Sequence, residues 1–158
     1  MCRKQIKVNA IKHGTVIDHI AAGKVLKVIE ILEINGNNSV MMGMNLSSSK
    51  IGKKDIIKIE NRELSEAEAN SIALISPRAT LIIIKDFAVV KKVELTMPET
   101  IEKLIICPNP QCITNLEGVK TRFTIDSAQQ IVRCGYEKKS PHVFQKWQAI
   151  PPPSPTAT

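Results

Sequence analysis

Three cysteines in the last third of the sequence have the clearest potential chemistry. Cys107 and Cys112 flank a Pro-Asn-Pro-Gln turn, and Cys134 follows after a longer stretch. Two cysteines on a tight turn present both sulfurs to one point, as in tetrahedral zinc sites. Clustered cysteines in an intracellular chain are more often metal ligands than disulfides. We therefore predict a bound Zn²⁺; three free thiols without metal are the alternative.

The fourth ligand of such a zinc site is not a cysteine here. Glu137 stands where a Cys-x-x-Cys pair beginning at Cys134 would place its second cysteine. We predict the Glu137 carboxylate as the fourth ligand, with His142 as the second candidate and water as the third. A carboxylate is a harder ligand than a thiolate, so zinc should be held more loosely than by four cysteines.

A second group of candidate residues consists of lysines that alternate with apolar residues: Lys54, Lys58, Lys85, Lys91 and Lys92. A single lysine on a strand usually points into solvent. Together with Asp18 and His19, which follow a glycine turn, these lysines could instead form a pocket for a triphosphate and a base. Periodicity alone leaves both interpretations open.

Composition narrows the function classes. The 158 residues carry a net charge of +7, which suits nucleotides, polyanions or an acidic partner, or reflects an ordinary excess of lysine. No apolar run reaches the ~18–20 residues of a membrane span, so we expect a cytoplasmic protein without a membrane partner. Phosphate-loop, dinucleotide-binding and nucleophile-elbow motifs are absent from the sequence, so we predict that the chain is not an enzyme.

Periodicity predicts the elements that must position these residues. Strands are expected over 5–11, 39–45, 54–60, 80–84 and 88–93, and helices over 21–32 and from Ser65 to about Ser76. Gly14 should interrupt the chain after the first strand, and Ser47 to Ser49 should form a loop. Ser65 and Glu68 have the spacing of a capping box.

The order of these elements is typical of an α+β fold, a ferredoxin-like antiparallel sheet with two helices. This domain should fill residues 1–95, with a linker at 96–100. Residues 101–145 are expected to form a small all-β zinc-binding domain, too small for a self-sufficient core without the metal. The proline-rich residues 146–158 should be a disordered tail.

Several stretches together resemble a known family. Residues 8–20 read VNAIKHGTVIDHI, residues 54–61 read KDIIKIEN, and shorter matches follow at 76–80 and 107–109. They are similar to the aspartate carbamoyltransferase regulatory chain, over residues 6 to about 136. GTVIDHI together with KDIIKIEN is far more specific than a lone Cys-x4-Cys.

The resemblance implies a non-catalytic subunit of a pyrimidine-biosynthesis enzyme. In that family the N-terminal domain binds CTP or UTP as inhibitors and ATP as an activator, and it pairs with itself into a dimer. The zinc domain contacts the catalytic chain, and three regulatory dimers bridge two catalytic trimers. Transfer of the carbamoyl group belongs wholly to the catalytic chain.

The resemblance also implies nucleotide-site residues. Asp18 and Lys58, with backbone groups at Ile11, should bind the base and ribose. Lys92 should meet the phosphates, with Lys54 and His19 nearby. The remaining implied residues line the base and sugar or lie near the phosphates and a second nucleotide: Ile84, Val89 and Asn45. The chain departs from the family at Phe87, where the family has tyrosine, at the missing fourth cysteine, and in its proline-rich end.

A nucleic-acid-binding zinc-ribbon protein is the alternative from another class. The net charge and the cysteine turn favour it. Such a protein needs aromatic stacking platforms or a contiguous basic stripe. The sequence has no long Lys/Arg block and only five aromatic residues, namely Phe87, Phe123, Tyr136, Phe144 and Trp147. We therefore expect nucleoside triphosphates, a catalytic chain and a second copy of this chain as partners, and no nucleic acid.

Overall fold

The computed structural model describes residues 10–129 and 131–137 and the backbone of 142 and 143. The chain divides into two compact units, Met1–Thr96 and Met97–Thr158, which are described separately. Within the part of the chain described, no helix has the length and apolar character needed to cross a membrane. The segments predicted at 5–9 and 146–158 lie outside the described residues.

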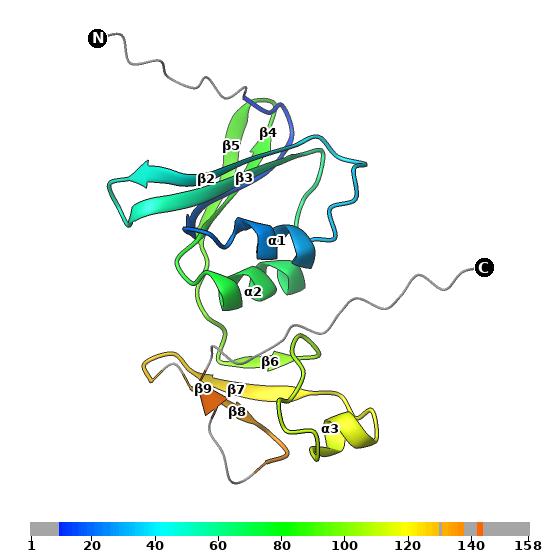
Figure 1. Ribbon diagram of the computed structural model, residues 1–158. Coiled ribbons are helices and arrows are strands. Elements are labelled where there is room, and N and C mark those ends of the chain that lie inside the picture. Colours follow the sequence, from blue (N-terminus) through cyan, green and yellow to red (C-terminus); the bar gives the residue numbers. More distant parts are fainter. Residues whose placement is uncertain (1–9, 130, 138–141, 144–158) are drawn as a thin grey trace, which may run out of the picture. The chain divides into compact units, whose positions relative to one another are not determined.

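The first unit is one antiparallel sheet with two helices. Its elements are, in chain order, β1 (Gly14–Ala21), α1 (Val25–Ile31), β2 (Val40–Ser48), β3 (Gly52–Glu60), α2 (Glu66–Ile75), β4 (Thr80–Lys85) and β5 (Ala88–Glu94). The strand order is β2-β3-β1-β4-β5, and every neighbouring pair is antiparallel (Figure 1). This is the predicted ferredoxin-like arrangement with β5 added at one edge, so the predicted α+β fold is confirmed.

Both helices pack on the same face of this sheet (Figure 1). The core between them is aliphatic, and its fully buried members include Ile17, Ile57, Val28 and Ile72. Burial of one such side chain contributes about 1.5–3 kcal/mol. Among the described elements, no helix covers the other face of this sheet.

Gly14 has a different role from the one predicted. It opens β1 rather than interrupting the chain, and its φ is +144°. A Cβ at this position would lie 2.1 Å from the carbonyl oxygen of Ile59 on β3. Only glycine allows the two strands to approach this closely.

Other predicted boundaries also shift. Ala10 and Ile11 are described and lie outside any strand. The first helix begins at Val25, not at 21, because Ala21 is still paired with Lys54 in the sheet. The serines expected in a loop at 47 and 48 belong to β2, where Ser47 pairs with Lys53.

The two helices begin with different caps. In α2 the predicted capping box is present: the backbone N–H of Glu68 donates to the Ser65 hydroxyl, and the Ser65 N–H donates to Glu68 Oε2 at 2.8 Å. The N-terminus of α1 has no cap from its own residue, Lys24. Asp55 on β3 caps this N-terminus instead.

Asp55 is completely buried and accepts three backbone hydrogen bonds. Its Oδ2 accepts from the N–H groups of Gly23, at 2.8 Å, and Val25, at 3.1 Å. Its Oδ1 accepts from the N–H of Asn45 at 2.9 Å. One carboxylate therefore joins the start of α1 to an irregular point in β2, where Asn45 has a φ of +54° and the register with β3 shifts.

The second unit is a four-stranded antiparallel sheet in the order β6-β7-β8-β9. Its elements are β6 (Thr100–Glu102), α3 (Ile113–Leu116), β7 (Arg122–Asp126), β8 (Ile131–Cys134) and β9 (His142–Val143). Phe123 and Val132 are fully buried, with Ile101 and Ile125 beside them in the sheet register. This core is small, as expected for a sheet-rich domain held by a metal.

The Asp55 interaction gives a stability prediction. Asp55→Ala leaves three backbone N–H groups without their acceptor, at 1–3 kcal/mol for each one that stays buried, so we expect a loss of about 3 kcal/mol or more in the free energy of unfolding. Urea unfolding followed by circular dichroism measures it.

Glu30→Ala, an exposed acid on α1, is the matched control and should change the free energy by less than about 0.5 kcal/mol. Equal midpoints for the two variants would show that Asp55 is not a main support of this unit.

Candidate metal centre and ligand-binding face

Three sulfurs meet in the second unit. The Sγ atoms of Cys107, Cys112 and Cys134 all lie within 4.8 Å of one another, and the three residues are buried. The Cys112 and Cys134 sulfurs are 3.8 Å apart. Spacings of this size suit thiolates that share one tetrahedral ion, so the structure brings together the three predicted cysteine ligands.

The turn before α3 fixes two of these cysteines. The Asn115 side chain donates to the carbonyl oxygens of Cys107, at 2.9 Å, and Asn109, at 2.7 Å. The Cys112 N–H donates to the Asn109 carbonyl at 3.0 Å. These hydrogen bonds fix the turn and bring Cys107 and Cys112 to the same point.

The third cysteine comes from the end of β8. Beyond it, the N–H of Gly135 donates to the Arg122 carbonyl at 2.8 Å, and a Cβ on Gly135 would lie 3.3 Å from that oxygen. The Glu137 N–H donates back to the Cys134 carbonyl at 3.3 Å. This tight turn carries Glu137 beside the sulfur cluster.

Glu137 does not join the sulfurs directly. Its carboxylate accepts a hydrogen bond from the side-chain amide of Asn109. Among the described residues, the group of closely spaced ligand atoms contains the three cysteine sulfurs and not this carboxylate. The side chain of His142 lies outside the described part. The identity of the fourth ligand stays a prediction.

The three thiols differ in acidity. Burial raises the pKa of Cys107 to about 12 and also raises the pKa of Cys134. For Cys112, burial also acts to raise the pKa, but hydrogen bonds from the hydroxyl, at 3.2 Å, and the backbone N–H of Thr114 outweigh it, so the pKa is lowered. The positive charge of a bound divalent ion would offset the free-energy cost of burying thiolates. The cluster therefore fits a soft divalent metal.

The uncovered face of the first sheet brings together two predicted lysines. Val16 on β1 is opposite Lys58 on β3 and Ile82 on β4, and Ile82 is opposite Lys92 on β5. Residues directly opposite each other project from the same face of a sheet. The next residue, Ile17, points into the helix-covered core. Lys58 and Lys92 thus flank two aliphatic residues in one row on the face away from the helices, and Met41 on the edge strand β2 continues the row beyond Lys58.

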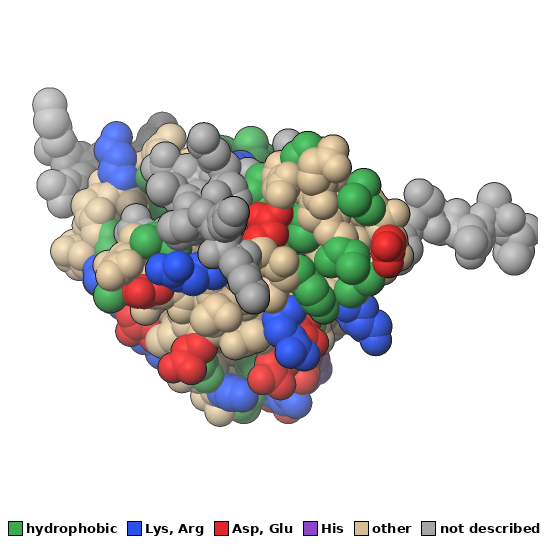
Figure 2. Space-filling model, turned by 90° about the horizontal axis from the view of Figure 1, so that it is seen from below, with side chains coloured by type: hydrophobic (Ala, Val, Ile, Leu, Met, Phe, Trp, Pro, Cys, Tyr) green, Lys and Arg blue, Asp and Glu red, His purple; other side chains and the backbone are tan. Residues whose placement is uncertain are grey.

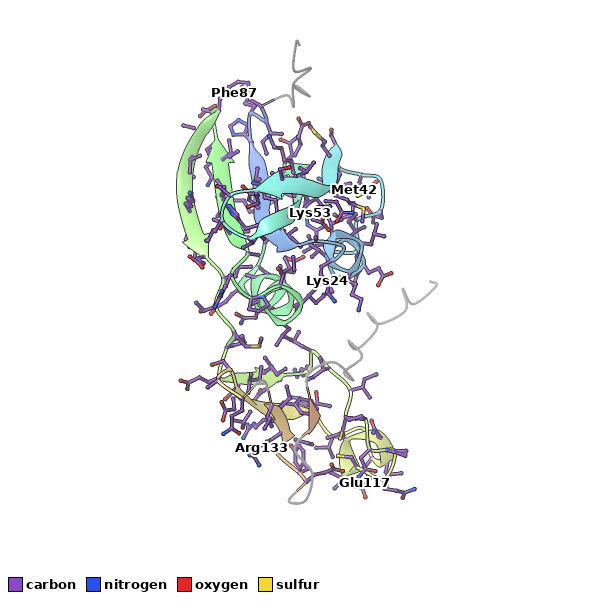
Figure 3. The ribbon with its side chains drawn as sticks, turned by 60° about the vertical axis from the view of Figure 1, so that its left-hand side comes forward. Lys24, Met42, Lys53, Phe87, Glu117 and Arg133 are labelled. Carbon is purple, nitrogen blue, oxygen red and sulfur yellow. The ribbon has the colours of Figure 1, made fainter. Side chains whose placement is uncertain are left out.

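The neighbouring row on that face holds the two predicted apolar residues. Gly14 is opposite Ile84, and Ile84 is opposite Val89. Gly14 contributes no side chain, so this part of the face is open above β1, and Val89 is 60% exposed. The turn beyond carries Phe87, labelled in Figure 3, whose N–H donates to the Lys12 carbonyl at 3.0 Å. That bond places the segment following Ile11 against the same end of the sheet.

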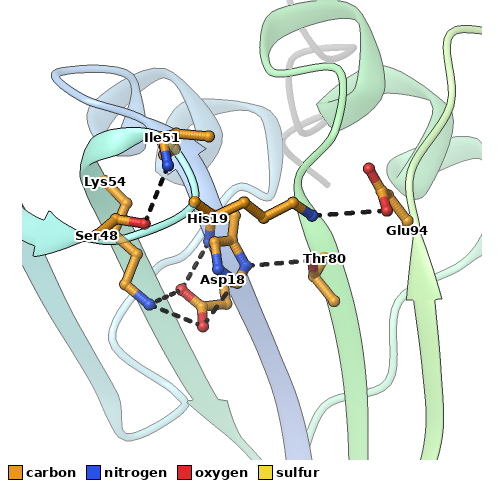
Figure 4. A network of polar contacts seen from close by, with 8 residues as sticks. Asp18, His19, Ser48, Ile51, Lys54, Thr80 and Glu94 are labelled. Carbon is orange, nitrogen blue, oxygen red and sulfur yellow. Dashed lines mark hydrogen bonds and ion pairs between the residues drawn. The ribbon is translucent and has the colours of Figure 1, made fainter.

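Asp18 is the centre of a polar network on β1 (Figure 4). Lys54 Nζ lies 2.7 Å from one carboxylate oxygen and 3.0 Å from the other, and the His19 N–H donates to Asp18 at 2.7 Å. Burial acts to raise the pKa of Asp18, but these hydrogen bonds from Lys54 and His19 outweigh it and lower the pKa. Asp18 is therefore a charged hydrogen-bond acceptor.

Not all of the predicted nucleotide-site residues lie close together. His19 Nδ1 lies 3.3 Å from the hydroxyl of Thr80, a residue that sequence reasoning missed although it ends the 76–80 match. Asn45 stands apart on the edge strand β2 and is linked to the rest through Asp55. Asp55 was also missed, because nothing in its local sequence distinguishes a buried cap from an ordinary surface acid.

The charged side chains do not form a basic stripe on the face seen in Figure 2. There, Lys and Arg side chains are interspersed with Asp, Glu and apolar side chains. Nonspecific nucleic-acid binding needs a groove of one sign of charge along the strand. This face offers no such groove.

Comparison with known proteins agrees with the geometry. Residues 6–96 match the family model described as aspartate carbamoyltransferase regulatory chain, allosteric domain, and residues 99–140 match the metal binding domain of the same chain.

Curated relatives carry that name too. The protein from Pyrococcus abyssi is 52% identical over 136 residues, which cover 84% of this chain and 90% of the relative. The protein from Methanococcus vannielii is 47% identical over 136 residues, covering 85% and 92%. The protein from Thermococcus gammatolerans is 47% identical over 135 residues, covering 84% and 89%. Each is named aspartate carbamoyltransferase regulatory chain.

The acidity of the thiols gives a pH prediction. At pH 7 the raised pKa values keep Cys107 and Cys134 protonated in the metal-free protein, so binding one divalent ion should release about two to three protons. Because lower pH favours the protonated thiols, metal affinity should fall as pH falls. Calorimetric titration of metal-free protein with Zn²⁺ in buffers of different ionisation enthalpy counts the protons. An affinity that is constant between pH 6 and 8 would contradict this assignment.

Proposed function

The chain belongs to the aspartate carbamoyltransferase regulatory chain family, and from that premise we propose that it is the non-catalytic subunit that binds CTP and UTP as inhibitors and ATP as an activator. It would bridge catalytic trimers and leave the reaction of pyrimidine biosynthesis to them. The observation that carries the nucleotide assignment is the row on the sheet face that no described helix covers, where Lys58 and Lys92 flank two aliphatic residues. Two cations that flank an aliphatic surface suit a ligand with an anionic tail and a flat base.

Each group has a role in this proposal. Lys92 binds the phosphates, with His19, Lys54 and Asn45 near them. Lys58, Asp18 and the backbone at Ile11 bind the base and ribose, and Ile84 and Val89 pack against them. The lowered pKa of Asp18 supports its role as acceptor, and the exposure of Val89 supports its role as an apolar contact.

Opposite responses to ATP and CTP follow from linkage. A ligand shifts an equilibrium between two states only by binding them unequally. Both nucleotides carry a triphosphate, so the lysines give common affinity and cannot distinguish them. The difference must come from the base end, where a purine and a pyrimidine fill the space near Ile11 and Asp18 differently.

For the metal, we propose Zn²⁺ on Cys107, Cys112 and Cys134, with Glu137 as the fourth ligand. Glu137 would have to exchange its hydrogen bond with Asn109 for the ion. Zinc bound here would stabilise the second unit directly, because its own core is small. The three buried thiols also suit a reducing compartment, so we place the protein in the cytoplasm.

Two protein partners complete the proposal. The metal-binding unit contacts the catalytic chain, and the first unit pairs with a second copy of itself. Support for self-pairing comes from the edge strand β2, where Met41, Met42, Met44 and Leu46 are all exposed. An exposed apolar edge strand is a ready template for another strand.

The site assignment is tested by removing charge from the row. Lys58→Ala or Lys92→Ala should weaken both CTP and ATP binding, since each loses a charge-assisted contact of ~1.5–3 kcal/mol. Calorimetry on the full chain measures the affinities. Lys27→Ala, an exposed lysine on α1 beyond the other face, is the control and should bind both nucleotides normally. Unchanged affinity in both test variants would reject the site.

Chelation tests the metal-dependent docking. A strong chelator should loosen the second unit and detach the chain from catalytic trimers, while the first unit keeps its nucleotide affinity, because its core contains no cysteine. Gel filtration of the complex with and without chelator reads the first effect, and calorimetry with ATP reads the second. Metal loss without dissociation would exclude this docking role.

A further inference from the structure

A second concave site lies beside the Asp18 network. It is a pocket of about 390 Å³, and it is open to solvent. Its lining comes from three separate segments: His19 on β1, Ile51 and Lys53 at the β2–β3 turn, and Ser76, Pro77 and Arg78 after α2. None of the lysines of the nucleotide row lines it. A pocket of this volume can enclose a small polar molecule.

The pocket has excess positive charge. Among the described residues, neither Lys53 nor Arg78 has an acidic partner. Two acids on the strands beside it are already neutralised by other lysines. Asp18 pairs with Lys54, and Glu94 pairs with Lys50 at 3.6 Å. A cation pair without counter-charge in a concave site attracts anions.

Lys53 and Lys54 serve different sites because they are neighbours in a strand. Successive side chains on a strand point to opposite faces. Lys54 reaches Asp18 and the nucleotide face, whereas Lys53, labelled in Figure 3, lines the pocket. His19 is the one residue that the pocket shares with the proposed nucleotide site.

The walls of the pocket are held in unusual backbone conformations. His19 has a φ of +55° and Arg78 a φ of +77°, the left-handed region that residues other than glycine seldom adopt. Hydrogen bonds fix both segments: the Ala21 N–H donates to the Ser76 hydroxyl at 2.9 Å, and the Arg78 N–H donates to the Leu95 carbonyl at 3.1 Å. Strain of this kind clusters at binding sites, and a fixed site loses less entropy on binding.

We propose that this pocket is a second anion site, separate from the nucleotide row, that binds a small molecule with at least two phosphate charges. The Arg78 guanidinium supplies the planar fork that pairs with phosphate oxygens, and Lys53 adds a second positive charge. The occupant would tie β1 and the β2–β3 turn to the loop that bonds Leu95, close to the end of the first unit.

The test uses pyrophosphate and the full, metal-loaded chain. The double variant Lys58→Ala/Lys92→Ala removes both lysines of the nucleotide row, so a further loss of binding on adding Arg78→Gln reports the pocket. We expect this variant to bind pyrophosphate by calorimetry, and we expect Arg78→Gln added to it to weaken that binding about tenfold or more. Lys27→Gln added instead should leave the affinity unchanged.

Three results would overturn the proposal. They are an absence of pyrophosphate binding in the double variant, an unchanged affinity after Arg78→Gln, and an equal loss after Lys27→Gln. Circular dichroism confirms that the variants fold. The single variant Arg78→Gln should bind ATP with normal affinity in a calorimetric titration. This result would separate failure of the pocket proposal from failure of the nucleotide-site proposal.

Discussion

The first unit depends on one buried carboxylate. Asp55 carries a charged or strongly polar group into a site with no exposure to water, which is costly unless the group is fully hydrogen-bonded. Three backbone amides, from Gly23, Val25 and Asn45, meet that requirement. The same bonds fix where α1 starts and where β2 bends. Lys54 is the adjacent residue in β3, so its side chain projects from the other face of the sheet, where it pairs with Asp18.

Features that depend on interactions between neighbouring residues were predicted from the sequence. The capping box at Ser65 and Glu68, the β-rich runs that form β3 and β4, and the cysteine turn each need only a few neighbouring residues. The role of Gly14 could not be predicted in this way, since it depends on the carbonyl of Ile59, far away in the chain. The cap supplied by Asp55 and the contact of Thr80 with His19 arise from strand register, which only the folded sheet defines.

In the second unit, too, local features were predictable from the sequence, whereas contacts between distant residues were not. The types and spacing of the three cysteines were sufficient to predict that they converge, and the hydrogen bonds of Asn115 explain how the turn presents two of them. Sequence did not predict that Asn109 holds the Glu137 carboxylate. Such a bond joins a turn to the end of a strand, and its partners have no common periodicity. The unit combines a small core with buried thiols, so its stability is coupled to the ion it would hold.

The two edge strands of the first sheet, as far as the structure describes the chain, differ. On β2 the edge carries exposed methionines, whereas every residue of β5 is exposed and two consecutive lysines, Lys91 and Lys92, stand in its middle. Charge on an edge strand repels another strand that would add there. A sheet that can grow at one edge only, against the same edge of a second copy, closes on a twofold axis and stops at two. The lysine proposed to hold phosphate would thus also keep the protein from polymerising into open filaments.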